Sequence, residues 1–209
     1  VNDPSLINTW MAEAELAKLA DTLKKATHGW EEHLKLAELK FELQDYSNAL
    51  EDYEAAILLN PNMVRPFFGR ANTRLKLIEL TNSEMDEYYL FNANTGFTTP
   101  PDEAIRMAQE FSYDDVISDY DRVIELDPAF PFAWYNRGYV KAMNGNYWGA
   151  ISDLTRAAEL DPEFAAAFYN KGLLLIYLNL KAVGCQDISM AGELGIEQAY
   201  PVLKRYCVK

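Results

Sequence analysis

The sequence is poor in the side chains on which catalysis and metal binding usually depend. Its 209 residues include two histidines and two cysteines, and they contain no glycine-rich phosphate-binding loop. His28 and His33 stand five residues apart with no cysteine near them. That spacing does not place both rings on one helix face, so we expect no zinc site. No nucleophile motif surrounds either histidine. The sequence therefore predicts a protein that is not an enzyme and that needs no cofactor or metal.

Long apolar runs are also missing. The run from Leu173 to Leu178 is six residues long, far short of the ~18 that a membrane-spanning helix needs. No signal peptide follows Val1. The chain also lacks an initiator methionine, as a processed or truncated piece would. We therefore expect no membrane span in this chain, and both the cytoplasm and the periplasm remain open as compartments.

Basic residues are scarce. The chain has 19 lysines and arginines against 32 aspartates and glutamates, for a net charge of −13. An acidic surface repels phosphate backbones, so nucleic acid is not an expected partner. Basic proteins or peptides would be attracted on encounter. The alternative is that the charge serves solubility alone.

The two cysteines, Cys185 and Cys207, both lie near the C-terminus. A reducing compartment would keep them as thiols, whereas an oxidising one would allow a bridge. The sequence leaves both states open.

What the chain has in abundance is internal repetition with a period of 34 residues. Trp134 to Gly138 recurs as Phe168 to Gly172, and Asp127-Pro128 recurs as Asp161-Pro162. A fixed period of this length with small residues at fixed places is typical of a helix-pair repeat. Gly138 and Gly172 are expected to permit a close approach of the paired helix. The sequence therefore predicts an all-α chain.

The period divides the chain into four repeats with one interruption. Pro61 and Pro128 are 67 residues apart instead of 34, so about 33 extra residues fall inside the second repeat. In this extra segment, Glu79 to Phe91 is expected to extend the helix, and Ser112 with Asp115 resembles a capping box that restarts the repeat. The predicted divisions are a helix or cap at 1–29, repeats at 30–63, 64–130 (with an insertion at about 79–111), 131–164 and 165–197, and a capping helix at 198–209.

These residues resemble the tetratricopeptide repeat. The match rests on Trp134, Gly138, Gly145, Tyr147, Ala150, Ala157 and Pro162. The resemblance implies an α-solenoid of antiparallel helix pairs coiled into a right-handed superhelix. Arg70, Arg137 and Lys171 depart from the pattern, which often has leucine there. The C-terminal Gly184 to Gly195 resembles the ending of repeat proteins common in Bacteroidetes-type bacteria.

The resemblance also implies that the first helix of each pair lines a concave face that binds a protein or peptide. On this basis the candidate binding residues are Arg65, Phe68, Asn72, Phe132, Tyr135, Asn136, Tyr139, Tyr169, Asn170 and Tyr177. In the first repeat the matching positions are Glu31, Leu34, Lys35, Glu38 and Phe41. Asn136 and Asn170 stand one repeat apart, so they could form a ladder that binds an extended peptide backbone. The alternative is that they bond to neighbouring helices.

The insertion supplies a second candidate surface, because insertions in repeat arrays often emerge on the binding face. Its aromatic residues are Tyr88, Tyr89, Phe91 and Phe97. They would either contact a partner or pack back on the array. Non-catalytic protein or peptide recognition is thus the predicted function. Two alternatives remain: a structural spacer or assembly domain of a longer protein, and a small-ligand receptor in an aromatic pocket near the insertion.

Overall fold

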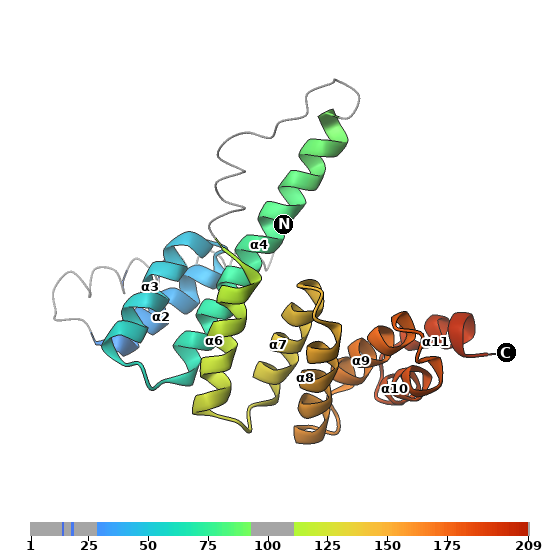
Figure 1. The fold of residues 1–209 in the computed structure, drawn as a ribbon. Helices are drawn as coiled ribbons and strands as arrows, with labels where there is room; N and C mark the ends of the chain where they lie inside the picture. The colour runs from blue at the N-terminus through green and yellow to red at the C-terminus, as the bar shows by residue number, and fades with distance from the viewer. Residues whose placement is uncertain (1–13, 15–17, 19–28, 93–110, 209) are drawn as a thin grey trace, which may run out of the picture. The chain divides into compact units, whose positions relative to one another are not determined.

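The computed structural model describes residues 14, 18, 29–92 and 111–208, with no side chains described for 84–92, and these residues form helices and no strand (Figure 1). The all-α prediction is confirmed for this part of the chain. The predicted N-terminal helix or cap falls almost wholly outside it. The helices are α2 (Trp30–Glu42), α3 (Tyr46–Leu59), α4 (Val64–Asn92), α6 (Tyr113–Leu126), α7 (Pro131–Met143), α8 (Tyr147–Leu160), α9 (Ala165–Tyr177), α10 (Lys181–Glu193) and α11 (Ala199–Val202), followed by the π-helical turn η1 (Leu203–Cys207).

The chain divides into two compact units, Val1–Asp119 and Tyr120–Lys209, and the division falls inside α6. In the first unit α2 packs against α3, and α3 packs against α4. In the second unit α7 packs on α8, α8 on α9, and α9 on α10. Within each unit these helices therefore contact their neighbours in sequence, as expected for a solenoid of helix pairs.

The turns inside the pairs repeat as well. Gln44, Gly145 and Asn179 follow α2, α7 and α9, and each has a positive φ, of 62°, 80° and 68° respectively. A left-handed residue after a helix ends its hydrogen-bond ladder and reverses the chain. The same backbone turn is thus made three times, although only one of the three residues is a glycine.

Helix α4 is the exception among the first helices. It has 29 residues, whereas α2, α7 and α9 have 13 each. Figure 1 shows its C-terminal part running well past α2 and α3 of the same unit. The prediction that Glu79 to Phe91 extends the helix is confirmed, while Phe97 and the rest of the segment 93–110 lie outside the described residues.

The restart of the second repeat is a capping box, as predicted. The Asp115 backbone N–H donates to Ser112 Oγ at 3.2 Å, and the Ser112 backbone N–H donates to Asp115 Oδ2 at 3.1 Å. The two side chains thereby satisfy N–H groups that a helix start leaves without partners. Helix α6 begins at the next residue, Tyr113.

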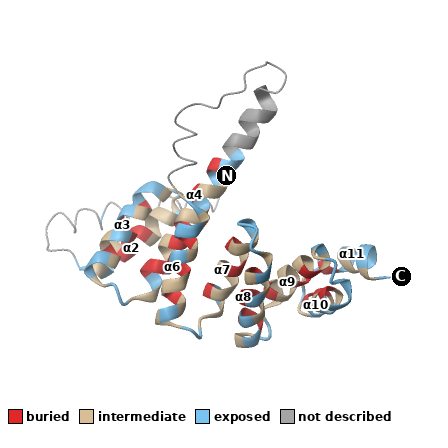
Figure 2. Ribbon diagram, viewed as in Figure 1, coloured by how far each residue is buried: buried red, intermediate tan, exposed pale blue. Residues whose placement is uncertain are grey.

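In the fourth pair the two helices approach so closely that a Cβ atom at the contact would collide with backbone. A Cβ atom added to Gly172 would lie 2.8 Å from the backbone oxygen of Gly184, and one added to Gly184 would lie 2.7 Å from that of Gly172. In the third pair a Cβ atom added to Gly138 would lie 3.1 Å from the backbone oxygen of Ala150. Figure 2 shows buried residues along the faces where neighbouring helices meet. The predicted role of Gly138 and Gly172 is confirmed.

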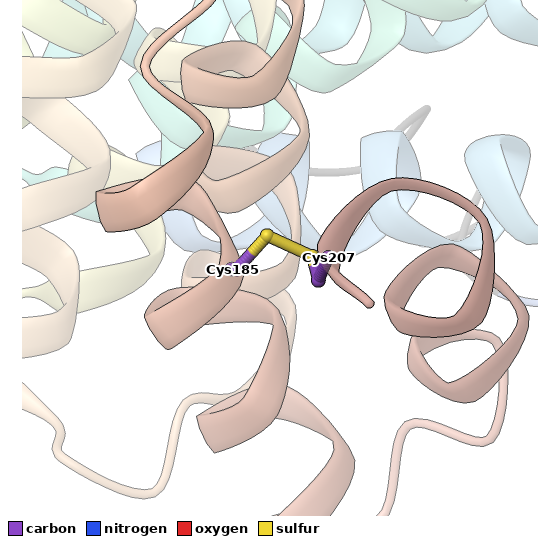
Figure 3. The surroundings of a disulfide bond; sticks show 2 residues. All are labelled: Cys185 and Cys207. Carbon is purple, nitrogen blue, oxygen red and sulfur yellow. A yellow bond between two sulfur atoms is a disulfide. The ribbon is translucent and has the colours of Figure 1, made fainter. Parts of the chain in front are cut away.

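The C-terminal end differs from the single helix predicted there. Helix α11 is only four residues long, and η1 follows with a wider turn in which the Val208 N–H donates to the Leu203 carbonyl at 3.2 Å. Cys207, the last residue of η1, forms a disulfide with Cys185 of α10 (Figure 3). Of the two states that the sequence left open, the structure has the bridge.

Replacing Gly172 by alanine should destabilise the second unit by about 1–3 kcal/mol, because a backbone oxygen cannot move aside as a side chain can. Gly192→Ala is the matched control. Its Cβ would meet nothing closer than Ala199 Cβ at 3.4 Å, so the better helix propensity of alanine should stabilise by about 0.5–1 kcal/mol. Urea denaturation followed by circular dichroism measures both. Equal effects of the two variants would contradict the close approach.

Removing the disulfide with Cys185→Ser should release α11 and η1 from α10. The bridge closes a loop with a sequence separation of 22, and loops of this size contribute about 3 kcal/mol in the chain-entropy account. Amide hydrogen exchange should therefore rise across residues 199–207 in this variant and in reduced wild-type protein. Ser189→Ala on the same helix is the control. Unchanged protection in the reduced protein would show that packing alone holds the end.

Candidate functional site

Each helix pair carries one aspartate on its second helix that binds basic side chains of its first helix. In the third pair Asp153 accepts two hydrogen bonds from Arg137, at 2.7 and 2.8 Å, and it forms an ion pair with Lys141 at 2.8 Å. The second pair repeats this with Asp119, Arg70 and Arg74. In the first pair Asp52 pairs with Lys40 and His33, and in the fourth Asp187 pairs with Lys171. These contacts explain why cations replace the leucine expected at Arg70, Arg137 and Lys171.

The fourth pair is the weakest of the set. Leu175 stands where the second and third pairs have their second cation, Arg74 and Lys141. Asp187 Oδ2 is buried without a hydrogen-bond partner among the described residues. Burial raises the pKa of Asp187, and its contact with Lys171 only partly opposes this.

In the first unit, the face of α2 and α4 holds a pocket of about 180 Å³ that we call the α2–α4 pocket. It is lined by Glu38, Phe41, Tyr53, Arg65, Phe68, Gly69 and Asn72. Five of these stand at positions for which the sequence predicted a concave face, among them Arg65, Phe68 and Asn72. Arg65 Nη2 bonds both oxygens of Glu38, at 2.7 and 3.0 Å, at the pocket rim. The structure thus brings these predicted residues together.

Sequence reasoning missed Tyr53 and Gly69 of this pocket. A Cβ atom on Gly69 would collide with the Tyr53 ring, so the ring occupies space that only glycine leaves free. Burial is the main cause that raises the pKa of the Tyr53 phenol; Glu38 and Glu42 add to it, and Arg65 opposes it. The repeat register contained a signal: Gly69 stands where the third and fourth repeats have Asn136 and Asn170.

In the second unit an aromatic row lies at the N-terminal ends of α7 and α9. The ring centroids of Phe132 and Phe164 are 5.1 Å apart, those of Tyr135 and Phe164 4.7 Å, and those of Phe130 and Phe132 5.7 Å. Phe132 remains 49% exposed. Phe130 and Phe164 were not among the candidates, although they stand one 34-residue period apart.

Asn170 joins this row. Its Nδ2 donates to the Tyr135 hydroxyl at 2.9 Å, linking α9 to α7. Burial raises the pKa of Tyr135, and the bond from Asn170 opposes that shift. The bond to a neighbouring helix is the alternative that the sequence left open for this asparagine. One of its two amide hydrogens is thereby engaged within the protein.

The other predicted residues fall into three groups. Asn136, Tyr139 and Tyr169 are half-buried on α7 and α9. Tyr177 ends α9, 69% exposed, and its ring meets Tyr147 with centroids 5.3 Å apart, away from the aromatic row. Of the insertion candidates, Tyr88, Tyr89 and Phe91 lie on α4 in the stretch without described side chains, and Phe97 lies outside the described residues.

Metal-binding clusters and membrane spans are both missing from the part of the chain that the structure describes. These residues contain no group of three or more histidine, cysteine, aspartate or glutamate side chains that could hold a metal ion. None of the described helices is long and apolar enough to cross a membrane.

Comparison with known families identifies the kind of repeat in two stretches of the chain. Models described as "Tetratricopeptide repeat" match residues 33–63 and 119–152. The chain carries tetratricopeptide repeats. The first match covers most of α2 and all of α3, and the second runs from Asp119 into α8. No curated protein gives a significant sequence match, and the likeness to Bacteroidetes-type proteins stays a prediction.

Solved structures with tetratricopeptide repeats share the fold. MamA 41-end from Desulfovibrio magneticus RS-1 has a TM-score of 0.69 at 16% identity, covering 90% of this chain and 87% of its own. TTC0263, a thermophilic repeat protein of Thermus thermophilus, has a TM-score of 0.59 at 15% identity, covering 97% of this chain and 92% of its own. The Arabidopsis OM64 repeat domain reaches 0.52 at 16% identity, covering 69% of this chain and 93% of its own. At these identities the likeness concerns the fold alone, an α-solenoid of helix pairs.

The raised pKa of Asp187 predicts a sign for the pH dependence of stability. The folded state binds the proton of the Asp187 carboxyl group more tightly than the unfolded state does. The contribution of this proton to folding stability is therefore full below the ordinary pKa of 3.8 and is lost as pH rises through the folded pKa. The unfolding free energies of wild type and Asp187→Asn are measured by urea denaturation from about pH 3 to about pH 6. The value for wild type minus the value for Asp187→Asn should fall as pH rises.

Asp115→Asn is the control with the opposite sign. Bonds from Ser112 lower the pKa of Asp115, so its contribution is present above 3.8 and is lost as pH falls through the folded value. If both differences from wild type changed in the same direction with pH, the assignment for Asp187 would be wrong.

Proposed function

We propose that this chain is a non-catalytic scaffold that binds an extended segment of a partner protein along the first helices of its repeats. The observation that carries the proposal is the surface of those helices. In both units they present aromatic side chains beside hydrogen-bonding groups: Phe41, Phe68 and Asn72 in the α2–α4 pocket, and Phe132, Tyr135 and Asn170 in the aromatic row.

Such surfaces suit peptide recognition for a physical reason. Aromatic rings bury a large apolar area with few rotatable bonds, so little conformational entropy is lost when a peptide packs on them. Half-exposed Phe132 can accept a further apolar neighbour. Amides such as Asn72 can bond a peptide backbone as donor and acceptor.

The second helices offer a contrast within the same unit. Trp148 on α8 is 63% exposed, yet it lies on the second helix of its pair, outside the predicted binding face. It therefore serves as a matched control: an exposed aromatic whose loss should leave recognition intact.

We infer that the chain works in an oxidising compartment. Both of its cysteines are joined in one disulfide, and such bonds persist outside reducing compartments. Of the two compartments that the sequence left open, this favours the periplasm.

The scaffold proposal is tested by affinity capture from the native organism's lysate with three baits: wild type, Phe132→Ala/Asn170→Ala, and Trp148→Ala. A protein recovered by wild type and Trp148→Ala should be depleted at least about tenfold on the double variant, the effect of losing one buried aromatic contact. Calorimetry with the purified partner then checks direct binding, and circular dichroism checks that all baits are folded.

Equal recovery on the wild-type and doubly substituted baits would remove the aromatic row from the binding surface. If the wild type recovered nothing above background, the alternative of a spacer or assembly domain would replace the scaffold proposal.

A further inference from the structure

We propose that the α2–α4 pocket binds one apolar side chain of the partner's peptide, and that a lysine or arginine next to it in the peptide binds Glu38 and Glu42. The proposal rests on the scaffold function above and specifies the partner's chemistry. It concerns only the first unit, which supplies every residue of the pocket.

The pocket exists because of one substitution within the repeat register. The third and fourth repeats carry Asn136 and Asn170 on the first helix, and the second repeat carries Gly69 there. Without a side chain at this place, the Tyr53 ring of α3 reaches the surface of α4 and forms the pocket floor. Phe41 of α2 and Phe68 of α4 are its aromatic walls.

The size and the lining fit an apolar side chain. The volume is about 180 Å³, and a cavity of roughly 150 Å³ lined by apolar side chains holds a benzene ring. A phenylalanine or leucine side chain thus fits, whereas a tryptophan would fill the pocket beyond its rim. Three aromatic rings contribute dispersion contacts on several sides of such a guest.

The charges around the pocket select what stands beside that side chain. Glu38 lines the pocket together with Arg65, and Glu42 lies one turn further along α2. Two carboxylates and one guanidinium therefore act on the Tyr53 phenol, where both carboxylates raise its pKa and Arg65 lowers it. The whole chain carries a charge of −13. A basic neighbour in the peptide is therefore attracted on approach and at the rim.

Arg65 does not block this arrangement. Its side chain is 68% exposed where it meets Glu38, and exposed ion pairs contribute little to stability. A carboxylate accepts several hydrogen bonds, so Glu38 can bind a peptide cation together with Arg65 or in its place.

The test uses fluorescein-labelled heptapeptides of sequence Gly-Ser-Lys-Xaa-Lys-Ser-Gly, with Xaa as phenylalanine or alanine, and a third peptide in which glutamates replace the lysines around phenylalanine. Fluorescence polarisation should show the Lys-Phe-Lys peptide binding wild type at least about tenfold more tightly than the alanine peptide. The peptide with glutamates around phenylalanine should bind wild type more weakly than the Lys-Phe-Lys peptide does. In Glu38→Gln the difference in affinity between these two peptides should be smaller.

Gly69→Ala puts a Cβ atom where the Tyr53 ring forms the pocket floor. The displaced ring should weaken binding of the Lys-Phe-Lys peptide about tenfold or more, while Gly192→Ala in the second unit should leave its binding unchanged. Phe68→Ala serves as a second pocket variant should Gly69→Ala fail to fold. It removes a wall and should weaken the same peptide.

The proposal is overturned if no peptide binds, if the phenylalanine and alanine peptides bind equally, or if the pocket variants bind as wild type does. Self-association of wild type that Gly69→Ala abolishes, seen by sedimentation, would make a second copy the occupant and overturn it too. A cellular partner that Gly69→Ala still captures would leave the scaffold function standing without this pocket. Failure of wild type to capture any partner would instead count against the scaffold function itself.

Discussion

The close approach of the two helices within each pair is the constraint on which the other features depend. At Gly172 and Gly184 the backbones are so near that neither residue could carry a Cβ atom without a shift. Gly138, Ala37 and Ala71 are small and buried at the matching place in the other pairs. This contact leaves little freedom in how the first helix rotates against the second. The same side chains of each first helix therefore face away from its partner, whatever their chemistry.

The aspartate–cation contacts follow from that geometry. Arg137 reaches Asp153 with two parallel bonds because the helices are close enough for a planar guanidinium to span them. Buried pairs of this kind add little net stability, since desolvation offsets their attraction, but a missing partner is costly. These ion pairs thus favour one alignment of the two helices along their axes over alignments shifted by a turn. In the fourth pair Leu175 replaces the second cation, and the unpaired Oδ2 of Asp187 is the result.

Much of the fold could be predicted from the sequence, because the features that define it are local and repeated. The period predicted a helix pair within 30–63, where the structure has α2 and α3, and the pattern of Ser112 and Asp115 located the start of α6. The short α11 and the π-helical turn were not predictable, since they depend on how the chain end folds onto α10. The bridge between Cys185 and Cys207 depends on that same path. The cations at Arg70 and Arg137 were noticed as departures, but their aspartates lie on the other helix and required the pairing to be known.

The resemblance to the tetratricopeptide repeat implied which face Phe68 and Phe132 occupy, but it could not give the shape of that surface. Whether a position forms a wall, a floor or a void depends on side chains from other helices, such as Tyr53 beneath Gly69. Identical pairs would offer the same surface at every repeat and could not fix where along the array a peptide binds. A single glycine in place of asparagine breaks this equivalence, because the Tyr53 ring of α3 then fills the space that a side chain on α4 would take. The position does not belong to the close contact inside the pair, so that contact can stay the same while the packing between α3 and α4, and with it the surface, changes.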